Sequence, residues 1–536
     1  MIDGVQKIIS VIKKEYGKSV MNIYYSIKNK KATYHLLPLT QESDIFIDIH
    51  KTTNIDVVYI CTLYSPFNLG NWINLEKEIV KYVLMDKDYR FVKYKYKMKD
   101  IFPDEYRTLY ESPLEADELS LLIDETGNRT FAMYEDCNLM QVIGKLKTKN
   151  VTDMCDMFAN CDTITTIPQL DTSETTDMTF MFVSCDAIES VPMMDTSKVI
   201  SMRYMFADCL KLATIPQFDT SNVMDMYGMF WDCHELITIP RLDTSQVMSM
   251  NRMFKDCFAL NDVPQMNTQN VEDMSYMFAG CCKLKEIPLL NTKNVEDMSC
   301  MFSGCSILTL VPQLDTHGVV DMSHMFSDCE KLTTIPLLKT ESCEDMSNMF
   351  MNCIEFITMP QLRTYNVENM AYMFYKCSKL TTIPLLETEN CIDMSYMFGY
   401  DVELTNVPQL DTSSVEHMNG MFIDCRKLTT IPEFNTENVK DMNNMFSYCN
   451  ELTIVPQLNT SNVKDMRYMF EHCKSLTSLP IFDIHSLEMI NDEHPLHNML
   501  KNTNITSITF RNKPNNLNIT SEILCGKSNQ IRINFI

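Results

Sequence analysis

The chain contains few of the residues and motifs on which enzymes and membrane proteins usually depend. Its 536 residues include only 12 glycines and 2 tryptophans, and they contain no P-loop, no GxSxG elbow and no HExxH zinc motif. No apolar run approaches the roughly 20 residues that a membrane-spanning helix needs. We therefore expect no catalytic residues, no cofactor, no metal and no membrane span.

The N-terminus also lacks the pattern of an export signal. Its short apolar stretch is interrupted by Lys13, Lys14 and Glu15, and no small-residue cleavage site follows. We therefore expect a chain without a signal peptide. Such a chain would fold in a reducing cytosol or leave the cell by an unconventional route.

Acidic residues outnumber basic ones, but the charge is unevenly distributed. The net charge is −25, whereas residues 1–100 contain 16 basic and 11 acidic residues, a net of +5, which leaves −30 for the remainder. A basic N-terminal segment followed by an acidic remainder, which we call the acidic body, argues for two units with different partners. The acidic body should repel nucleic acid and anionic membranes. The acidity could also serve only to keep a long repeat array soluble.

The residues in excess, 43 methionines and 21 cysteines, belong to an internal repeat. The pair Met157-Phe158 returns every 24 residues up to Met469-Phe470, which gives fourteen copies without an insertion or deletion. Each copy has a Pro eleven residues after the Met of the pair, as Pro168 follows Met157. All but one have a Cys four residues after the same Met, the exception being Asp401. A fixed period of this length is typical of a solenoid, in which stacked repeats bury one continuous core.

The apolar positions of one repeat fit neither a single long helix nor an alternating strand. The stretch DMSYMF at 273–278 has the i, i+3, i+4 spacing of a helix. The stretch LTTIPLL at 332–338 should be extended, because β-branched residues precede a proline. Each repeat has another Met three residues before the Met-Phe pair, from Met154 onward. The residue before this Met is Asp in ten copies, beginning with Asp153, and Asp is a preferred helix N-cap. We therefore predict an α/β solenoid with one short helical turn and one short parallel strand per repeat.

The recurring cysteines have three explanations. Neighbouring rungs about 5 Å apart would tolerate disulfides, and cysteines can also bind metals. Free cysteine, however, packs as a small buried apolar residue, and the sequence has neither CxxC spacing nor clustered histidines. We favour buried free thiols over disulfides and metal ligands. The methionines fall on the apolar positions too, which favours a core role over an adaptable binding groove.

A second period, of 48 residues, is superimposed on the first. The residue after the conserved Pro is Gln in every other repeat and mostly apolar in the repeats between. In the middle of the array these residues are Leu289, Gln313, Leu337, Gln361, Leu385 and Gln409. Two residues after the Cys position, Lys and Glu alternate from Lys331 to Glu451, so opposite charges should lie side by side. Either a repetitive ligand or a recent duplication of a two-repeat unit explains this pattern, and we favour the duplication.

The units DTSNVMDMYGMFWDCHEL (219–236) and NTSNVKDMRYMFEHCKSL (459–476) resemble the BspA-like leucine-rich repeats. The resemblance covers roughly residues 133–510. It implies a curved parallel-strand solenoid that binds proteins or cell-surface structures and carries no catalytic residues. Such repeats occur in surface adhesins of bacteria and protists, and in proteins of phages and large viruses. Without an export signal, we expect a virion component or a cytoplasmic protein rather than a cell-wall adhesin.

These observations predict a non-catalytic binding or adhesion protein whose solenoid recognises a protein or cell-surface macromolecule. Exposed apolar ladders often mark interaction sites, so the six residues after the prolines, from Leu289 to Gln409, are the candidate contacts. An intracellular protein–protein scaffold with no role in cell recognition is the alternative. An enzyme with its catalytic part in residues 1–130 is a third hypothesis, which a polar pocket of convergent titratable groups would support.

The segments on either side of the repeats differ in character. Residues 1–130 should form a small α/β or α+β domain that attaches the solenoid to a larger assembly. Its predicted helices cover 4–16 and 72–86, and its predicted strands cover 20–27, 32–38, 45–50, 57–63 and 89–97. The basic, aromatic segment Lys93–Lys97 could touch nucleic acid or an acidic partner, although a strand with one solvated Lys face is the simpler interpretation. We assign residues 131–150 to an N-terminal cap, 151–484 to the fourteen repeats, and 485–536 to an irregular last repeat, delayed by six residues, with a C-terminal cap.

Overall fold

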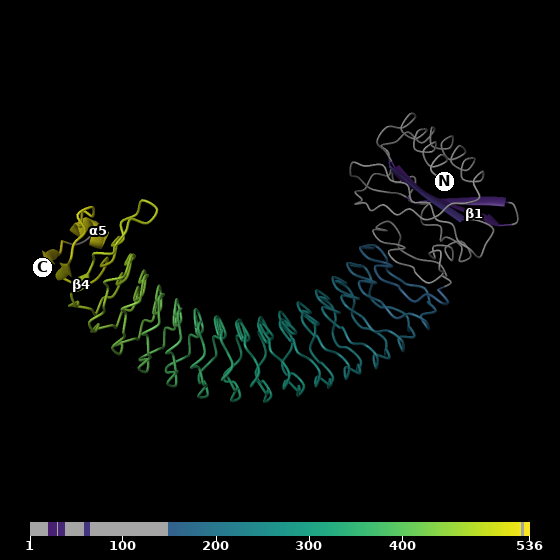
Figure 1. Cartoon of the computed structure of the whole chain (residues 1–536), viewed down its shortest axis with the longest axis horizontal. Coiled ribbons are helices and arrows are strands. Elements are labelled where there is room, and N and C mark those ends of the chain that lie inside the picture. Colours follow the sequence, from purple (N-terminus) through teal and green to yellow (C-terminus); the bar gives the residue numbers. More distant parts are fainter. Residues whose placement is uncertain (1–19, 29–30, 38–57, 65–147, 527–529) are drawn as a thin grey trace. The chain divides into compact units, whose positions relative to one another are not determined.

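A computed structural model describes residues 20–28, 31–37, 58–64, 148–526 and 530–536, and the chain divides into two compact units, 1–246 and 247–536. The first unit contains an antiparallel sheet in the order β2-β1-β3, labelled in part in Figure 1. Its strands are β1 (Val20–Lys28), β2 (Lys31–Leu37) and β3 (Val58–Tyr64).

These three strands agree with the strands predicted at 20–27, 32–38 and 57–63. The other elements predicted for residues 1–130 lie outside the described residues, as does nearly all of the predicted cap at 131–150. They are the helices at 4–16 and 72–86, the strands at 45–50 and 89–97, and the basic segment Lys93–Lys97.

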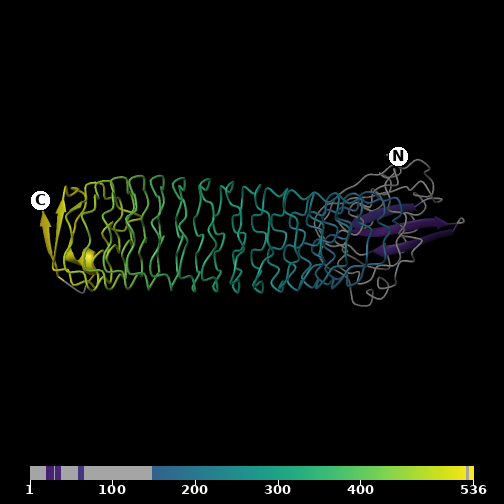
Figure 2. The same cartoon turned by 90° about the horizontal axis from the view of Figure 1, so that it is seen from below.

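From residue 148 onward, each 24-residue repeat forms one coil that stacks on the next within its unit (Figures 1 and 2). The predicted solenoid is therefore confirmed. Parallel pairing recurs at the residue that lies four positions before each Met-Phe pair, as in Asp273 with Asp297, and is one residue wide. We call the residues at this position the bridge residues. The stretch 332–338, predicted as the strand, forms no regular strand and contributes only isolated bonds, such as Ile357 N–H to the Thr333 carbonyl at 3.1 Å.

The segment predicted as a helical turn is a chain of tight turns instead. Met277 N–H donates to the Met274 carbonyl at 3.2 Å, and the next turn closes in the same i to i−3 manner. Tyr276 and Gly280 have φ angles of 58° and 77°. Positive φ cannot continue an α-helix, but the third residue of a type II turn requires it. The short-helix prediction is therefore wrong for the repeats. Asp273 nevertheless caps this segment, because its carboxylate accepts the Ser275 N–H at 2.9 Å.

The N–H groups that these turns leave unused bond to the next repeat. Tyr276 N–H donates to the Ser299 carbonyl and Phe278 N–H to the Met301 carbonyl, each at 2.9 Å. Every second amide of the segment therefore reaches a carbonyl 23 residues further along the chain. This spacing explains why the sequence holds its 24-residue period without an insertion.

The core consists of side chains stacked on their equivalents in neighbouring repeats. The Phe278 and Phe302 rings lie 5.9 Å apart with their planes within 4°, and Phe302 lies 5.7 Å from Phe326. The recurring cysteines are buried free thiols. Cys305 Sγ donates to the carbonyl of Phe278 in the preceding repeat at 3.2 Å. Burial of a small side chain thus also satisfies a backbone carbonyl.

The last repeat and the cap close the second unit. Phe470 N–H bonds to the Met499 carbonyl rather than to the residue 23 positions on, which confirms the predicted delay of six residues. A parallel sheet follows in the order β4-β5-β6, formed by β4 (Phe482–Asp483), β5 (Ser507–Arg511) and β6 (Arg532–Phe535). Helix α5 (Ser521–Cys525) is capped by Thr520. It packs on the last coil, where Leu500 N–H donates to the Leu524 carbonyl at 2.7 Å.

The repeated thiols should react only after unfolding. Burial raises the pKa of Cys473 to about 12 and that of Cys209 well above its ordinary value, so little reactive thiolate exists at pH 8. In a non-reducing denaturant, Ellman's reagent should titrate all 21 cysteines. The same reagent should label the repeated cysteines of the native chain slowly. Reaction of fewer than roughly half of the denatured cysteines would contradict free thiols.

Asp401, which occupies a Cys position, should lower the free energy of unfolding, and by more as the pH rises. It is fully buried, and neither carboxylate oxygen has a hydrogen-bond partner among the described residues. Burial raises its pKa well above the ordinary value. The folded chain therefore keeps a proton that the unfolded chain releases above about pH 4, and stability falls by about 1.4 kcal/mol per pH unit until the folded pKa is reached.

The substitution Asp401→Cys should therefore stabilise the chain by about 2 kcal/mol or more at pH 8, and by less at pH 5. Urea unfolding of both proteins at the two pH values measures this difference. The exposed Asp411→Asn substitution, in the next repeat, is the control. An equal difference at both pH values would show that Asp401 is already ionised in the fold.

Candidate partner-binding surface

The side chains that follow the conserved prolines lie on the surface, as the sequence analysis expected. Leu289, Leu337 and Leu385 are 61%, 58% and 55% exposed, which is unusual for leucine. They occupy every other repeat, with a glutamine between each two. We call these three residues the leucine ladder.

The glutamines of the same surface hold neighbouring repeats together. The Gln313 side-chain amide donates to the Leu337 carbonyl at 2.7 Å and also to the carbonyl of the residue that follows Gln313. Gln361 bonds in the same way to the Leu385 carbonyl, and Gln409 to the Glu433 carbonyl at 2.6 Å. Each candidate Gln thus contacts the equivalent residue of the next repeat. Its side-chain N–H groups already donate to backbone carbonyls and are not available to a partner. The leucine side chains remain free for a partner.

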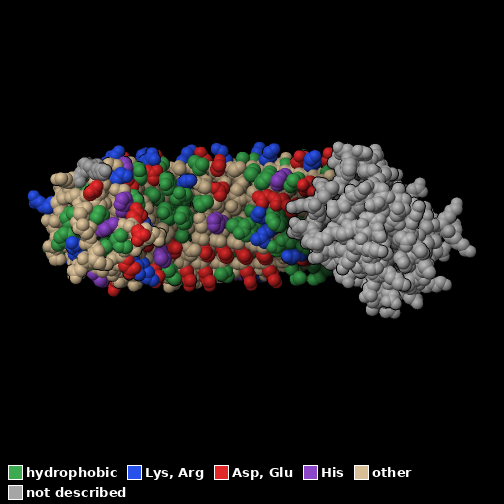
Figure 3. All heavy atoms as spheres, turned by 90° about the horizontal axis from the view of Figure 1, so that it is seen from above, with side chains coloured by type: hydrophobic (Ala, Val, Ile, Leu, Met, Phe, Trp, Pro, Cys, Tyr) green, Lys and Arg blue, Asp and Glu red, His purple; other side chains and the backbone are tan. Residues whose placement is uncertain are grey.

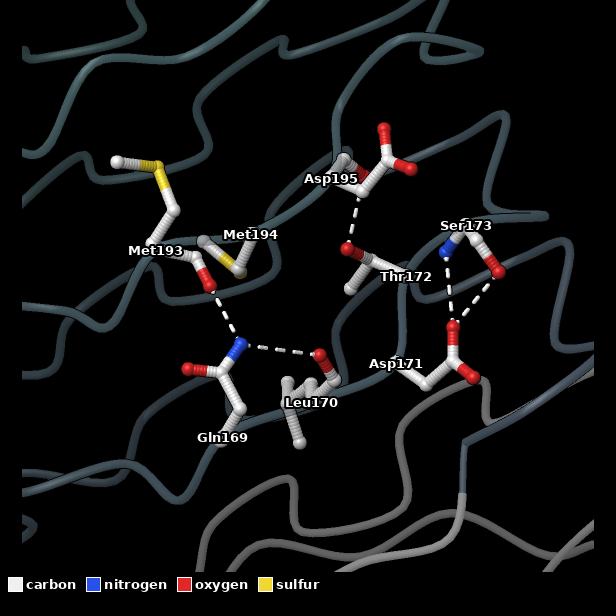
Figure 4. Close-up of a pocket in the computed structure, with 8 residues that line it drawn as sticks. All are labelled: Gln169, Leu170, Asp171, Thr172, Ser173, Met193, Met194 and Asp195. Carbon is white, nitrogen blue, oxygen red and sulfur yellow. Dashed lines mark hydrogen bonds between the residues drawn. The ribbon is translucent and has the colours of Figure 1, made fainter.

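Shallow hollows adjoin two of the glutamines that follow the conserved prolines, Gln169 and Gln409. Figure 4 shows the one at Gln169, whose amide donates to the Met193 carbonyl at 2.6 Å, while Thr172 donates to the Asp195 carbonyl at 2.7 Å. Hydrogen bonds from Ser173 lower the pKa of Asp171, so this carboxylate stays ionised and engaged in its own turn. A similar hollow lies at Gln409. The polar side chains drawn in Figure 4 thus serve the fold, because Asp171 and Ser173 hold their own turn, whereas Gln169 and Thr172 join this repeat to the next.

The alternating Lys and Glu side chains pair as predicted. Lys379 Nζ lies 2.5 Å from Glu355 Oε2, and Lys427 lies 2.5 Å from Glu403. Hydrogen bonding to Lys379 lowers the pKa of Glu355. Because these pairs are exposed, their main effect is to avoid a column of like charges rather than to stabilise the fold.

One carboxylate in the first unit, that of Asp208, has a clearly raised pKa. Asp208 and Asp232 occupy equivalent positions in consecutive repeats, and burial together with the Asp232 charge raises the pKa of Asp208 to about 6. His234 Nε2 lies 3.6 Å from the Asp232 carboxylate. Stacking of identical positions explains this pair without a catalytic role. Among residues 148–526 and 530–536, no group of three or more His, Cys, Asp or Glu side chains could hold a metal ion.

The repeat pattern did not predict a second surface, which lies on the turns. It carries the side chains that follow the bridge residues, including four tyrosines at 372, 375, 396 and 400. The signal for it was present in the sequence, since these positions vary between repeats and are aromatic in several of them, as also at Phe180 and Tyr204. A helix would have placed these side chains differently, because all of its residues are right-handed, whereas the turns contain left-handed residues.

No helix of the described residues is long and apolar enough to span a bilayer. Comparison with curated proteins gave no match. Solved structures with similar folds include a leucine-rich repeat protein from Eubacterium ventriosum. It is 13% identical with a TM-score of 0.33, over 63% of this chain and 87% of that chain.

Two further structures are similar at 12% identity. A plant peptide hormone receptor, RGFR1 in complex with RGF2, has a TM-score of 0.21 over 74% of this chain and 77% of its own. A TLR13–ssRNA13 complex has a TM-score of 0.19 over 70% and 68%. At these values, the fold assignment rests on the repeat geometry of the chain itself and on its family.

The family described as "Mycoplasma protein of unknown function, DUF285" matches residues 128–236, 210–309, 306–405 and 393–507. These four tandem matches run without a gap over more than half of the chain, and they cover the repeats whose BspA-like character the sequence predicted. The chain therefore belongs to the DUF285 family of BspA-like leucine-rich-type repeat proteins.

Proposed function

We propose that this chain is a non-catalytic binding protein whose solenoid recognises a macromolecular partner through the leucine ladder. The observation that carries the proposal is the exposure of Leu289, Leu337 and Leu385, between 55% and 61%, on backbone held in place by glutamine amides. Apolar side chains exposed on a rigid, repeating surface stabilise neither the core nor the turns. Such side chains are typical of an interaction site.

The proposed partner is a protein or a cell-surface macromolecule, and the proposed setting is a phage or virus particle, with residues 1–130 as the attachment domain. The BspA-like character of the repeats supports this setting. An intracellular scaffold is the second candidate. Mass spectrometry of purified particles and of cytosol from the same cells separates the two, because only a virion component should be enriched in the particles.

Substitution of Leu289, Leu337 and Leu385 by Asp should weaken binding of a captured partner at least about tenfold, because three apolar contacts become charged. Surface plasmon resonance with the immobilised full chain measures the change. The control substitutes Leu310, Ile357 and Ile454 by Asp; these are also exposed, at 61%, 47% and 63%, but they precede the conserved Pro by two or three residues instead of following it. Unchanged binding, or the same loss in both variants, would refute the leucine ladder as the binding surface.

A further inference from the structure

Four tyrosines form a compact group on the second unit, which we call the tyrosine patch (Tyr372, Tyr375, Tyr396 and Tyr400). Tyr372 and Tyr396 stack with ring centroids 4.8 Å apart, and Tyr375 meets Tyr372 and Tyr400 edge-on at 5.3 and 5.2 Å. All four side chains are half-buried. Figure 3 shows hydrophobic side chains gathered on the same face as rows of acidic side chains.

The backbone under this patch is conformationally costly. Tyr372, Tyr396 and Tyr400 have φ angles of 57°, 54° and 64°. Bulky residues rarely adopt this left-handed region, and each costs about 1 kcal/mol or more. Some equivalent positions hold residues that adopt this region readily, such as Asn348 and Gly420, and others hold aromatic residues, such as Phe180 and Tyr204. Tyrosines at these positions are therefore not required by the turns, and their side chains need another explanation.

Glycines in the same and the next repeat leave room for two of the rings. A Cβ atom added to Gly420 would lie 2.3 Å from the Tyr396 ring, and one added to Gly399 would lie 3.0 Å from the Tyr375 ring. The rings therefore lie directly over glycine backbone. Rings that are already ordered lose little conformational entropy when a partner binds.

Carboxylates lie beside the patch, and we call Glu344, Asp345, Glu368 and Asp393 the acidic strip. Glu368 N–H bonds to the Glu344 carbonyl at 2.8 Å, so these two side chains occupy consecutive rungs. Burial, the neighbouring Tyr396 and the Asp393 charge raise the pKa of Tyr372, so within the strip it is the Asp393 carboxylate that lies near this ring. Among the ion pairs of the described residues, none joins a carboxylate of the strip to a Lys or Arg. None of the four carboxylates thus has a basic partner among the described residues, while Asp345 and Asp393 also accept the N–H groups of Ser347 and Ser395.

The patch already accepts one cation from the chain itself. Lys376 Nζ lies 5.3 Å from the Tyr375 ring centroid and 5.9 Å from that of Tyr400, within the range of cation–π attraction. Arginine combines stacking on tyrosine with bidentate binding of carboxylates. We propose that the tyrosine patch and the acidic strip together bind an arginine-rich segment of a partner protein. This surface is separate from the leucine ladder, and the proposal does not depend on that ladder.

The test uses the full chain and a fluorescein-labelled twelve-residue peptide of alternating Arg and Ala, with fluorescence anisotropy in about 0.15 M salt. The double substitution Tyr372→Ala with Tyr396→Ala should weaken binding at least about tenfold. Tyr372→Phe with Tyr396→Phe should keep most of the affinity, because the ring faces remain. Circular dichroism melting of each variant checks that it folds, and the Phe variant tests the proposal even if the Ala variant does not fold.

Matched controls separate the patch from general attraction to an acidic chain. Tyr448→Ala removes an exposed tyrosine outside the patch and should leave affinity unchanged. Glu344→Gln with Glu368→Gln should weaken binding more than Glu437→Gln with Glu451→Gln, which changes the net charge equally. Equal effects within either comparison would overturn the proposal. Tighter binding of a peptide with Glu in place of Arg would overturn it as well.

The two proposed surfaces can fail independently. Replacement of Leu289, Leu337 and Leu385 by Ser, which adds no charge, should leave affinity for the arginine peptide unchanged. A loss in this variant would assign the peptide to the leucine ladder and reject the tyrosine patch as its site.

Discussion

Hydrogen bonds between residues 23 positions apart are the constraint on which the repeats depend. Within each repeat, tight turns use alternate amides, and the amides between them bond to the next coil, as Tyr276 does with Ser299. A single inserted residue would move every side chain of the coil away from its stacked equivalent. The phenylalanine column, with rings 5.9 Å apart at Phe278 and Phe302, therefore persists because the backbone fixes the register.

Carbonyl groups pose the second problem of such a stack, because a narrow ladder leaves many of them unpaired. Side chains supply the missing donors. Cys305 donates to Phe278, Gln313 to Leu337, and the buried Thr316 hydroxyl to the Lys339 carbonyl at 2.7 Å. The most regular residues of the sequence are thus hydrogen-bond donors to backbone as well as packing groups. They are consequently poor candidates for contacts with a partner.

The sequence was sufficient to predict the solenoid, its register, the buried thiols, the delayed last repeat and the exposure of Leu337. Each of these features depends on a periodic pattern, because residues that are one period apart in the sequence become neighbours in the stack. The turn geometry could not be found in this way, because Met274, Met277 and Phe278 have the same spacing in a helix and in consecutive turns. The tyrosine patch was missed for the same reason, since its exposure follows from the left-handed residues of those turns.

The alternation of charged side chains constrains how the array can change in length. Lys379 lies between Glu355 and Glu403 in consecutive repeats and pairs with Glu355. Recombination that removed one repeat would bring two glutamates, or two lysines, into adjacent coils, where like charges repel. Removal of two repeats would restore every pairing. Lengthening or shortening of this array by homologous exchange should therefore proceed in steps of two coils, which makes the pair rather than the single repeat the unit of evolutionary change.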